Sequence, residues 1–565
     1  MNLKWVQADD IDAELIESYA QRLNIPIIIS KILLNRGIDT FDQAKHFFRG
    51  SIDDLYDPFL MPDMEKAVNR IIQALNKKEK ILIYGDYDVD GITSVSVLYL
   101  LLQELGADVI FYIPHRIQEG YGLSLFGIDE ALKNQVSLII SVDCGITALE
   151  EVEYARKFNI DVIISDHHEE GLDLPHALAI LNPKCKNSNY PFQELAGVGV
   201  AYKLGQALVQ TMKLDSSIIE QFSDLVAIGS TADIVPLIDE NRIFVKEGLR
   251  MINNTEKPGL KALLKVAGMS DKPIGTGQIV FILAPRINAI GRMGDAQLAV
   301  ELLTTQDPAR AWKIANILES ENRIRKDIDE ETFRNAQTMV DSQFDLSNSY
   351  GLVLAREGWH PGVIGIVASR VVEKYYRPTV MISIDTEVGK GSARSISGFD
   401  IYQAIKQCED LLIAFGGHKY AAGLMIDKNN IDGFRQRFNE IAQQQLTDEL
   451  LQPKLRIDGE IRLSEITPRL VQLLKMFAPF GPQNMRPVFQ TNKLQVVGTP
   501  IIVGKNHLKF HVRQDGVVFD AIGFNLGDLI YRIEPGAYNL DMAYVVEENN
   551  YLGRTSLQLR VKDLR

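Results

Sequence analysis

The residues with the clearest chemical potential lie in an acidic loop that runs from Asp86 to Gly91. The loop carries Asp86, Asp88 and Asp90 at alternate positions, directly after a β-branched apolar run and before a segment typical of a helix. Carboxylates this close repel one another unless cations neutralise them, and hard cations prefer oxygen ligands. Because Asp-rich turns and helix caps are also common, the loop alone indicates a metal site without establishing one.

Two further sets of polar residues also follow apolar runs. Asp143 comes after residues 137–142, and Asp166, His167 and His168 follow the next run, at residues 162–165. Adjacent histidines are hard to explain by packing, whereas a neutral imidazole can bind a transition metal. We therefore expect one histidine to bind metal and its neighbour to face the substrate, with Asp166 orienting one of the rings.

A fourth carboxylate, Asp233, ends an apolar segment that could be a helix or a strand. It would be unremarkable alone, but four consecutive elements now end in possible metal ligands. Many Asp with one or two His and no thiolate suit Mn²⁺ or Mg²⁺ better than structural zinc. Two such ions, with Asp143 as a plausible bridge, could activate water and stabilise an in-line phosphoryl displacement, so we expect phosphoester hydrolysis.

These residues need a scaffold that brings the ends of their segments together. Apolar β-branched runs recur at residues 80–84, 109–113, 137–142 and 162–165, with helix-like segments between them. Strands that alternate with helices predict an α/β fold with a mainly parallel sheet covered on both faces. The chemistry of such sheets lies at the carboxyl ends of the strands, which is where these residues occur.

The remainder of the chain indicates several domains, because 565 residues are too many for one compact core. A long charged amphipathic segment at residues 307–343 is typical of a connecting helix. A second α/β unit follows, with strands near 351–355 and 379–383 and a helix at about 363–375. Short alternating strands beyond residue 453 favour a small β-barrel. The expected boundaries are a helical appendage at 1–50, a catalytic domain at 51–300, a connecting helix at 301–345, a second α/β domain at 346–448 and a barrel at 449–565.

Charge gives mixed evidence on nucleic-acid binding. The net charge of −14 argues weakly against it, because phosphate contacts need lysine and arginine. Between Ile466 and Gln514, however, there are seven Lys and Arg residues and no Asp or Glu. Phe480, Phe489 and Phe510 lie among them and could stack on bases, although phenylalanines in strands more often form a core. The predicted barrel is therefore the candidate surface for nucleic acid.

The composition is that of a globular intracellular protein. Hydrophobic residues make up 46% of the chain and charged residues 24%, which argues against extended disorder. No apolar run is long enough to span a bilayer, the N-terminus lacks a signal-peptide pattern, and the three cysteines are too far apart for a metal clip or a disulfide framework. We expect a soluble, cytoplasmic protein without membrane contact.

Asp166-His167-His168 and the loop Asp86–Gly91 together resemble the signature of the DHH phosphoesterase superfamily. Further motifs narrow the resemblance to the RecJ-like single-strand-specific exonucleases, and the similarity extends from about Pro58 to the C-terminus. No single motif is specific, but the set is. The motifs are Arg116 with Gly120–Leu123, Pro285–Ala289 with Gly291–Met293, Trp359–Gly365, Gly391–Ser395, and Gly416–His418 with Ala421–Gly423.

The resemblance implies roles for individual residues. The implied metal ligands are Asp86, Asp88, Asp90, Asp143, His167 and Asp233, and the implied catalytic residues are His168, facing the scissile phosphate, and Asp166. The implied substrate-binding residues are Arg116, Tyr121, Arg286, Asn288, Arg292, Ser392, Arg394 and His418. In the barrel we expect Arg486, Lys505, Lys509 and Arg513 to contact nucleic acid. Ala393 stands where glycine is usual, which bears on how closely the backbone there can approach a ligand.

Some of these basic residues suggest how a strand end is recognised. Arg286 and Arg394 come from opposite sides of the long connecting segment, and with Ser392 and His418 they could converge on one phosphate. The planar guanidinium fork suits a terminal phosphate, which offers more oxygens and more charge than an internal diester. We therefore expect recognition of a 5′ phosphate.

As a whole, the resemblance implies a DHH domain, a DHHA1-type second domain and a C-terminal OB fold. It implies a monomeric 5′-to-3′ exonuclease that uses two Mn²⁺ or Mg²⁺ ions, releases 5′-mononucleotides from single-stranded DNA in recombination and repair, and contacts the single-strand-binding protein. One alternative is a DHH pyrophosphatase or phosphodiesterase acting on cyclic dinucleotides or short oligonucleotides, which would need no basic barrel. Another is a non-enzymatic nucleic-acid clamp, which the complete set of ligands disfavours.

Overall fold

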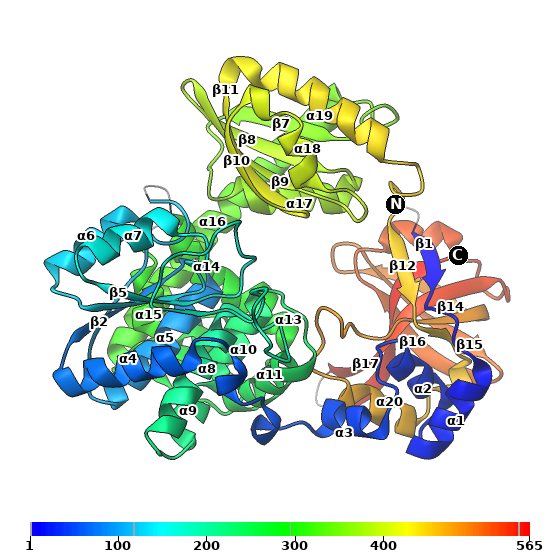
Figure 1. The fold of residues 1–565 in the computed structure, drawn as a ribbon. Helices are drawn as coiled ribbons and strands as arrows, with labels where there is room; N and C mark the ends of the chain where they lie inside the picture. The colour runs from blue at the N-terminus through cyan, green and yellow to red at the C-terminus, as the bar shows by residue number, and fades with distance from the viewer. Residues whose placement is uncertain (1–2, 117–118, 294, 552–553) are drawn as a thin grey trace. The chain divides into compact units, whose positions relative to one another are not determined.

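The computed structural model describes residues 3–116, 119–293, 295–551 and 554–565. They form two compact units, whose helices and strands are labelled in Figure 1. One unit contains Trp5–Gly291, Asp295–Ala315 and Arg456–Arg565, and the other consists mainly of Asn316–Leu455. None of the helices in the described ranges is long and apolar enough to cross a membrane.

The first unit contains the predicted parallel sheet, in the strand order β3-β2-β4-β5-β6. Strands β2 and β4 are buried on both faces, as expected for a central strand between two layers of helices. The register sets Gly85 against Val142 and Val142 against Ser165, so β2, β4 and β5 end at one level. The strands are β2 (Lys80–Gly85), β3 (Asp108–Tyr112), β4 (Leu138–Val142), β5 (Asp161–Ser165) and the short β6 (Ala179–Leu181), which the sequence pattern did not reveal.

Helices cover both faces of this sheet (Figure 1). On one face, Ile128 of α6 (Leu125–Lys133) and Val152 of α7 (Leu149–Lys157) share a core with Leu82 and Ile164 of the strands. On the other face lie α4 (Met64–Lys77), α5 (Val89–Glu104) and α8 (Gly197–Thr211). Further helices of the unit are α9 (Ser217–Glu220), α10 (Ser223–Ala232), α11 (Asp239–Ile252), α12 (Pro258–Val266), α13 (Thr276–Gln278), α14 (Ala284–Met293) and α15 (Gln297–Thr304).

The predicted connecting helix is α16 (Pro308–Gln343), one continuous helix of 36 residues. In the second unit, Ala336 and Val340 of α16 pack against Leu354 and Val367. The sheet has the order β10-β11-β9-β8-β7, and only β7 and β8 pair in parallel. Its elements are β7 (Leu352–Glu357), α17 (Ile364–Tyr375), β8 (Thr379–Asp385), β9 (Val388–Arg394), α18 (Ile401–Lys406), β10 (Leu412–His418), β11 (Ala421–Asp427) and α19 (Ile431–Gln445).

The C-terminal strands form a barrel in the order β14-β15-β16-β18-β17, closed by pairing between β14 and β17. The fold class is therefore as expected, an α/β protein with a C-terminal OB barrel. The elements are β12 (Lys454–Ile457), β13 (Gly459–Glu460), α20 (Pro468–Met476), β14 (Phe489–Val503), β15 (His507–Gln514), β16 (Val517–Gly523), β17 (Leu540–Tyr551) and β18 (Arg554–Leu564).

The N-terminal segment packs against this barrel. It begins with strand β1 (Lys4–Gln7), which the sequence pattern did not reveal, and continues with α1 (Ala13–Leu23), α2 (Ile27–Leu34) and α3 (Phe41–Arg49). Ile29 and Leu33 of α2 belong to the same hydrophobic core as Phe477 and Phe489. These helices and the barrel therefore bury their apolar surfaces together.

Candidate metal centre

The sheet brings the predicted metal ligands together. Asp86 follows β2, Asp143 follows β4 and His167 follows β5, whereas Asp233 lies at the C-terminal end of a helix, α10. Three groups of possible ligand atoms each lie within 4.8 Å of one another. The groups are Asp86, Asp88 and Asp143; Asp90, His167 and Asp233; and Asp143, His167 and His168. All six predicted ligands occur in them, and Asp143 belongs to two groups.

Nε2 of His167 faces three carboxylates. It lies 3.1 Å from Asp143 Oδ1, 3.6 Å from Asp233 Oδ2 and 3.8 Å from Asp90 Oδ2. Within the described residues, this nitrogen, Oδ1 of Asp143 and Oδ1 of Asp86 are buried and make no hydrogen bond. Buried polar atoms without partners are costly unless a ligand satisfies them. A set of carboxylate oxygens with one imidazole therefore fits Mn²⁺ or Mg²⁺.

The electrostatics of the cluster also favour bound cations. Burial, followed by repulsion from neighbouring carboxylates, raises the pKa of Asp86, Asp90 and Asp143 well above the ordinary value. The same causes raise the pKa of Asp233 to about 7. Burial lowers the pKa of His167 to about 3, so its imidazole is neutral and can coordinate a metal. Divalent cations at this site would offset the repulsion between the carboxylates.

Local backbone geometry positions the acidic loop and the turn after β4. Asp88 caps α5, because its Oδ1 accepts the backbone N–H groups of Asp90 and Gly91. Glycine is required at position 91, since a Cβ atom there would lie 2.5 Å from the carbonyl oxygen of Asp86. Asp143 adopts a φ of 58°, a left-handed conformation that is uncommon outside glycine and clusters at functional sites.

The N-terminus of α8 is a part of the centre that the sequence pattern did not reveal. The backbone N–H groups of Gly197 and Val198 donate to Oδ2 and Oδ1 of Asp90 at 2.7 and 2.9 Å. A Cβ atom at Gly197 would lie 2.6 Å from Asp143 Oδ1, so glycine lets this helix approach the cluster. The sequence Gly197-Val198-Gly199 at the start of an apolar segment indicates a closely packed helix N-terminus, but it does not identify the carboxylate that the helix contacts.

His168 has an environment unlike that of His167. Its Nδ1 lies 2.7 Å from Oδ1 of Asp166. Burial alone would lower the pKa of His168, but the hydrogen bond and charge of Asp166 outweigh burial and raise this pKa to about 9. The hydroxyl of Tyr121 donates to the carbonyl oxygen of Asp143 at 3.0 Å and lies 3.1 Å from His168 Nδ1. The three predicted residues Asp166, His168 and Tyr121 therefore adjoin the predicted metal ligands, and the raised pKa keeps His168 protonated at neutral pH.

The other predicted substrate residues of this unit lie on two segments. The guanidinium of Arg116 is 4.8 Å from the centre of the Tyr87 ring, so Arg116 stands beside the acidic loop. Arg286 and Asn288 lie on α14, where Arg286 is buried and donates to the carbonyl oxygen of Ile282 at 2.5 Å. The substrate contacts of these three residues stay predictions.

In the second unit, the structure places Ser392 and Arg394 on β9 and His418 on β10, the two strands that flank β11. Arg394 Nη1 donates to Ser392 Oγ at 3.2 Å, and both residues project from β9. The register puts Arg394 and His418 on one row across β9, β11 and β10. Arg292 donates to the carbonyl oxygen of Gly362, just before α17, at 2.8 Å. This surface offers basic groups at the end of a sheet.

The predicted basic residues of the barrel lie at its surface. Lys509 and Arg513 project outward from β15, because they alternate with residues of the core. Lys505 is exposed in the turn before β15, and the guanidinium of Arg486 lies 4.4 Å from the centre of the Phe480 ring.

Two of the barrel phenylalanines are core residues. Phe489 is 0% exposed and Phe510 is 1% exposed, so neither ring can stack on a base. Phe480 is partly buried and lies at the surface of the barrel.

Three family patterns match successive parts of the chain. Residues 80–230 match the DHH family, N-terminal domain, residues 348–444 match the DHHA1 domain, and residues 457–563 match the RecJ OB domain. The DHH match ends just before Asp233 and includes the other five predicted metal ligands.

Similar proteins cover the whole chain. The single-stranded-DNA-specific exonuclease RecJ of Bacillus subtilis is 40% identical over 98% of this chain and 70% of its own length. The protein of the same name from Escherichia coli is 33% identical over 96% of each chain. Among solved structures, RecJ from Thermus thermophilus in complex with Mn²⁺ matches with a TM-score of 0.86 and 28% identity, over 100% of this chain and 79% of that one. RecJ of the same organism in complex with Mg²⁺ matches with a TM-score of 0.79 and 26% identity, over 100% of this chain and 78% of that one.

Proposed function

Because the chain belongs to the RecJ family of single-stranded-DNA-specific exonucleases, we propose that it removes mononucleotides from the 5′ end of single-stranded DNA by two-metal hydrolysis. The observation that carries this proposal is the pair of ligand groups that share Asp143 and contain buried atoms without hydrogen bonds. Two overlapping groups suit two neighbouring ions. Bound there, the ions would supply an activated water and stabilise the attacking and leaving oxygens of an in-line displacement.

The chain's own residues complete the chemistry. Asp166 holds His168 in its protonated form, so the imidazolium can donate a hydrogen bond to a non-bridging oxygen of the scissile phosphate. The hydroxyl of Tyr121 lies beside the same ring and keeps its proton, since burial raises the pKa of Tyr121 far above neutrality. Arg116, next to the acidic loop, can bind an adjoining phosphate of the strand.

The remaining basic surfaces support specificity for a single strand with a 5′ phosphate. Ser392, Arg394 and His418 share one end of a sheet, and a guanidinium binds a terminal phosphate through two parallel hydrogen bonds. Lys509 and Arg513 project from the outer face of an OB barrel, a fold that binds single strands with little sequence preference. A phosphodiesterase for cyclic dinucleotides would need neither surface.

A digestion experiment tests the proposal. Single-stranded and duplex DNA, labelled at either the 5′ or the 3′ end, are incubated with the protein and Mn²⁺, and Asp143→Ala serves as the control for contaminating nuclease. We expect the 5′ label to appear first, as a mononucleotide, and from single strands only. Release of the 3′ label first would contradict the polarity, and turnover of cyclic or linear dinucleotides alone would favour the small-substrate alternative.

We also propose that the protein acts in DNA recombination and repair, in the cytoplasm, as a monomer that contacts the single-strand-binding protein, as the resemblance to RecJ-like exonucleases implies. Sedimentation of the purified protein, alone and with that partner, tests both the stoichiometry and the contact. A single species of one chain that shifts on addition of the partner is the expected result.

A further inference from the structure

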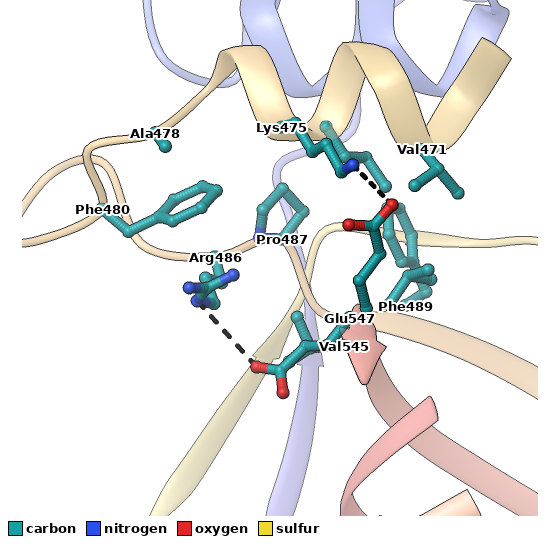
Figure 2. Close-up of a pocket in the computed structure, with 12 residues that line it drawn as sticks. Val471, Lys475, Ala478, Phe480, Arg486, Pro487, Phe489, Val545 and Glu547 are labelled. Atoms are coloured by element: carbon teal, nitrogen blue, oxygen red, sulfur yellow. Dashed lines mark ion pairs between the residues drawn. The ribbon is translucent and has the colours of Figure 1, made fainter. Parts of the chain in front are cut away.

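A pocket of about 290 Å³ lies on the outer surface of the barrel, between α20 and β17 (Figure 2). Val471 and Leu474 of the helix, with Val545 and Val546 of β17, form its apolar lining. The volume is near the lower end of the range for small-ligand pockets, ~300–1,000 Å³, so it suits one planar ring system.

Charged residues surround the mouth of this pocket. Lys475 pairs with Glu548 at 2.5 Å, and Arg486 pairs with Glu547 at 4.0 Å (Figure 2). Arg560 also contacts Glu547, at 3.4 Å. Each carboxylate therefore has a basic partner, and Glu547 has two.

The mouth carries more positive than negative charge. Three cations, Lys475, Arg486 and Arg560, pair with only two carboxylates, Glu547 and Glu548. Phosphate groups would offset this excess, whereas a cationic or neutral ligand would not.

The pocket continues the basic face of the barrel. Strand register places Lys509, Ile522, Arg560 and Val545 on one row across β15, β16, β18 and β17. The row begins at a predicted DNA contact, Lys509, and ends in the pocket lining, Val545, over three strand spacings of ~4.8 Å each. The guanidinium of Arg560 also lies 5.2 Å from the centre of the exposed Phe524 ring, which can stack on a neighbouring base.

We propose that the pocket between α20 and β17 takes one unstacked base of a bound single strand, while Arg486 and Arg560 contact the phosphates on either side of that base. This inference rests on the proposed function, because the strand that fills the pocket is the substrate itself. The aromatic ring of Phe480, over which the guanidinium of Arg486 lies, forms one side of the mouth. The pocket would fix the register of the strand on the barrel.

Fluorescence of 2-aminopurine tests the site, because stacking quenches this base and an unstacked position restores its emission. The base is placed at successive positions of a 5′-phosphorylated single strand, and the strands are bound to the full-length protein in EDTA. We expect a severalfold rise at one or two adjacent positions at a fixed distance from the 5′ end. A flat profile along the strand would overturn the proposal.

A substitution at the mouth gives the matched comparison. Ala478, just after the end of α20, is exposed and lines the pocket, so Ala478→Trp should block it, whereas Gln472→Trp alters an exposed residue of α20 that does not line it. We expect Ala478→Trp to remove the local rise and to weaken strand binding about tenfold, within the range for one stacked base. Gln472→Trp should do neither, and equal profiles for the two variants would contradict the site. If the unaltered protein bound no single strand at all, that result would instead contradict the proposed function. Melting temperatures of both variants verify that they fold.

Discussion

Asp166 and His168 form a partly buried hydrogen bond of 2.7 Å between Oδ1 and Nδ1, and this bond decides the charge of His168 next to the predicted metal ligands. The same carboxylate accepts the backbone N–H groups of Ile146, His167 and His168. Burial would raise the pKa of Asp166, but these bonds and the two histidines lower it. Asp166 is therefore a fixed anion that keeps His168 protonated.

Asp166→Asn should shift the alkaline limit of the reaction to lower pH. The pKa of His168 is about 9 beside the carboxylate, and without that charge it should fall toward or below its ordinary value of ~6.5. At pH 8 the variant imidazole would then be neutral, and the ratio of wild-type to variant rates should increase as pH rises from 6 to 9. Rate profiles at saturating Mn²⁺ measure this. An unchanged alkaline limb, with only a uniform loss of rate, would contradict the role of Asp166.

Removal of one metal ligand should abolish hydrolysis while the fold persists. Asp143→Ala and His167→Ala each remove a side chain that belongs to two of the ligand groups. Loss of a residue that only hydrogen-bonds to a metal ligand typically lowers activity ~10–100-fold, and the loss of activity here should be larger. Asp173→Ala, at an exposed residue in the loop after β5, is the matched control. Turnover by either ligand variant at the rate of the control would contradict the metal centre.

Divalent cations should stabilise the protein more at pH 8 than at pH 6. Burial and neighbouring carboxylates raise the pKa of Asp233 to about 7, above the ~3.9 of an unfolded Asp, so its contribution to stability in metal-free protein is lost as pH rises through 7. Mn²⁺ competes with a proton at pH 6 but not at pH 8. Melting temperatures with Mn²⁺ and with EDTA measure this gain in stability. A Mn²⁺ concentration about one hundred times the Kd should add ~2.7 kcal/mol to the free energy of unfolding.

The control for this pH dependence is Asp233→Asn, which cannot lose a proton. The gain from Mn²⁺ should be smaller in this variant and should differ less between pH 6 and pH 8. If the wild-type protein gained equally at both pH values, the raised pKa of Asp233 would not be relevant to metal binding.

Arg394→Ala should reduce the preference for a phosphorylated 5′ end. The guanidinium lies beside Ser392, and loss of a charge-assisted contact to the terminal phosphate should cost ~1.5–3 kcal/mol on phosphorylated strands only. Competition between 5′-phosphoryl and 5′-hydroxyl strands measures the preference. Arg356→Ala, at an exposed residue of the same sheet, should leave the preference unchanged. Equal losses of Arg394→Ala on both strands would contradict end recognition.

Lys509→Ala and Arg513→Ala should each flatten the salt dependence of strand binding. Loss of one phosphate contact should reduce the slope of log K against log salt by ~0.7 for single strands. Lys157→Ala, at the exposed end of α7, is the control for bulk charge. Point substitutions suit this test better than deletion of the barrel, because α1 to α3 share its hydrophobic core. If the slope of log K against log salt were unchanged in both variants, the strand would not contact Lys509 or Arg513.

Local patterns in the sequence were sufficient to predict most of the catalytic scaffold. The β-branched runs that became β2, β4 and β5 are the buried strands of one parallel sheet, and successive parallel strands end at one edge of their sheet. Asp86, Asp143 and His167 therefore had to lie close together. The long helix α16 was likewise evident from an amphipathic segment that lacks glycine and internal proline.

What depends on distant contacts could be decided only by the tertiary structure. His167 and His168 are neighbours in the sequence, yet burial lowers the pKa of one to about 3 and Asp166 helps to raise the other to about 9. Phe489 and Phe510 proved to be core residues because the barrel closes around them. Composition and periodicity determine which segments become strands and helices, whereas charge state, burial and the partners of each ligand arise from residues that meet only when the chain has folded.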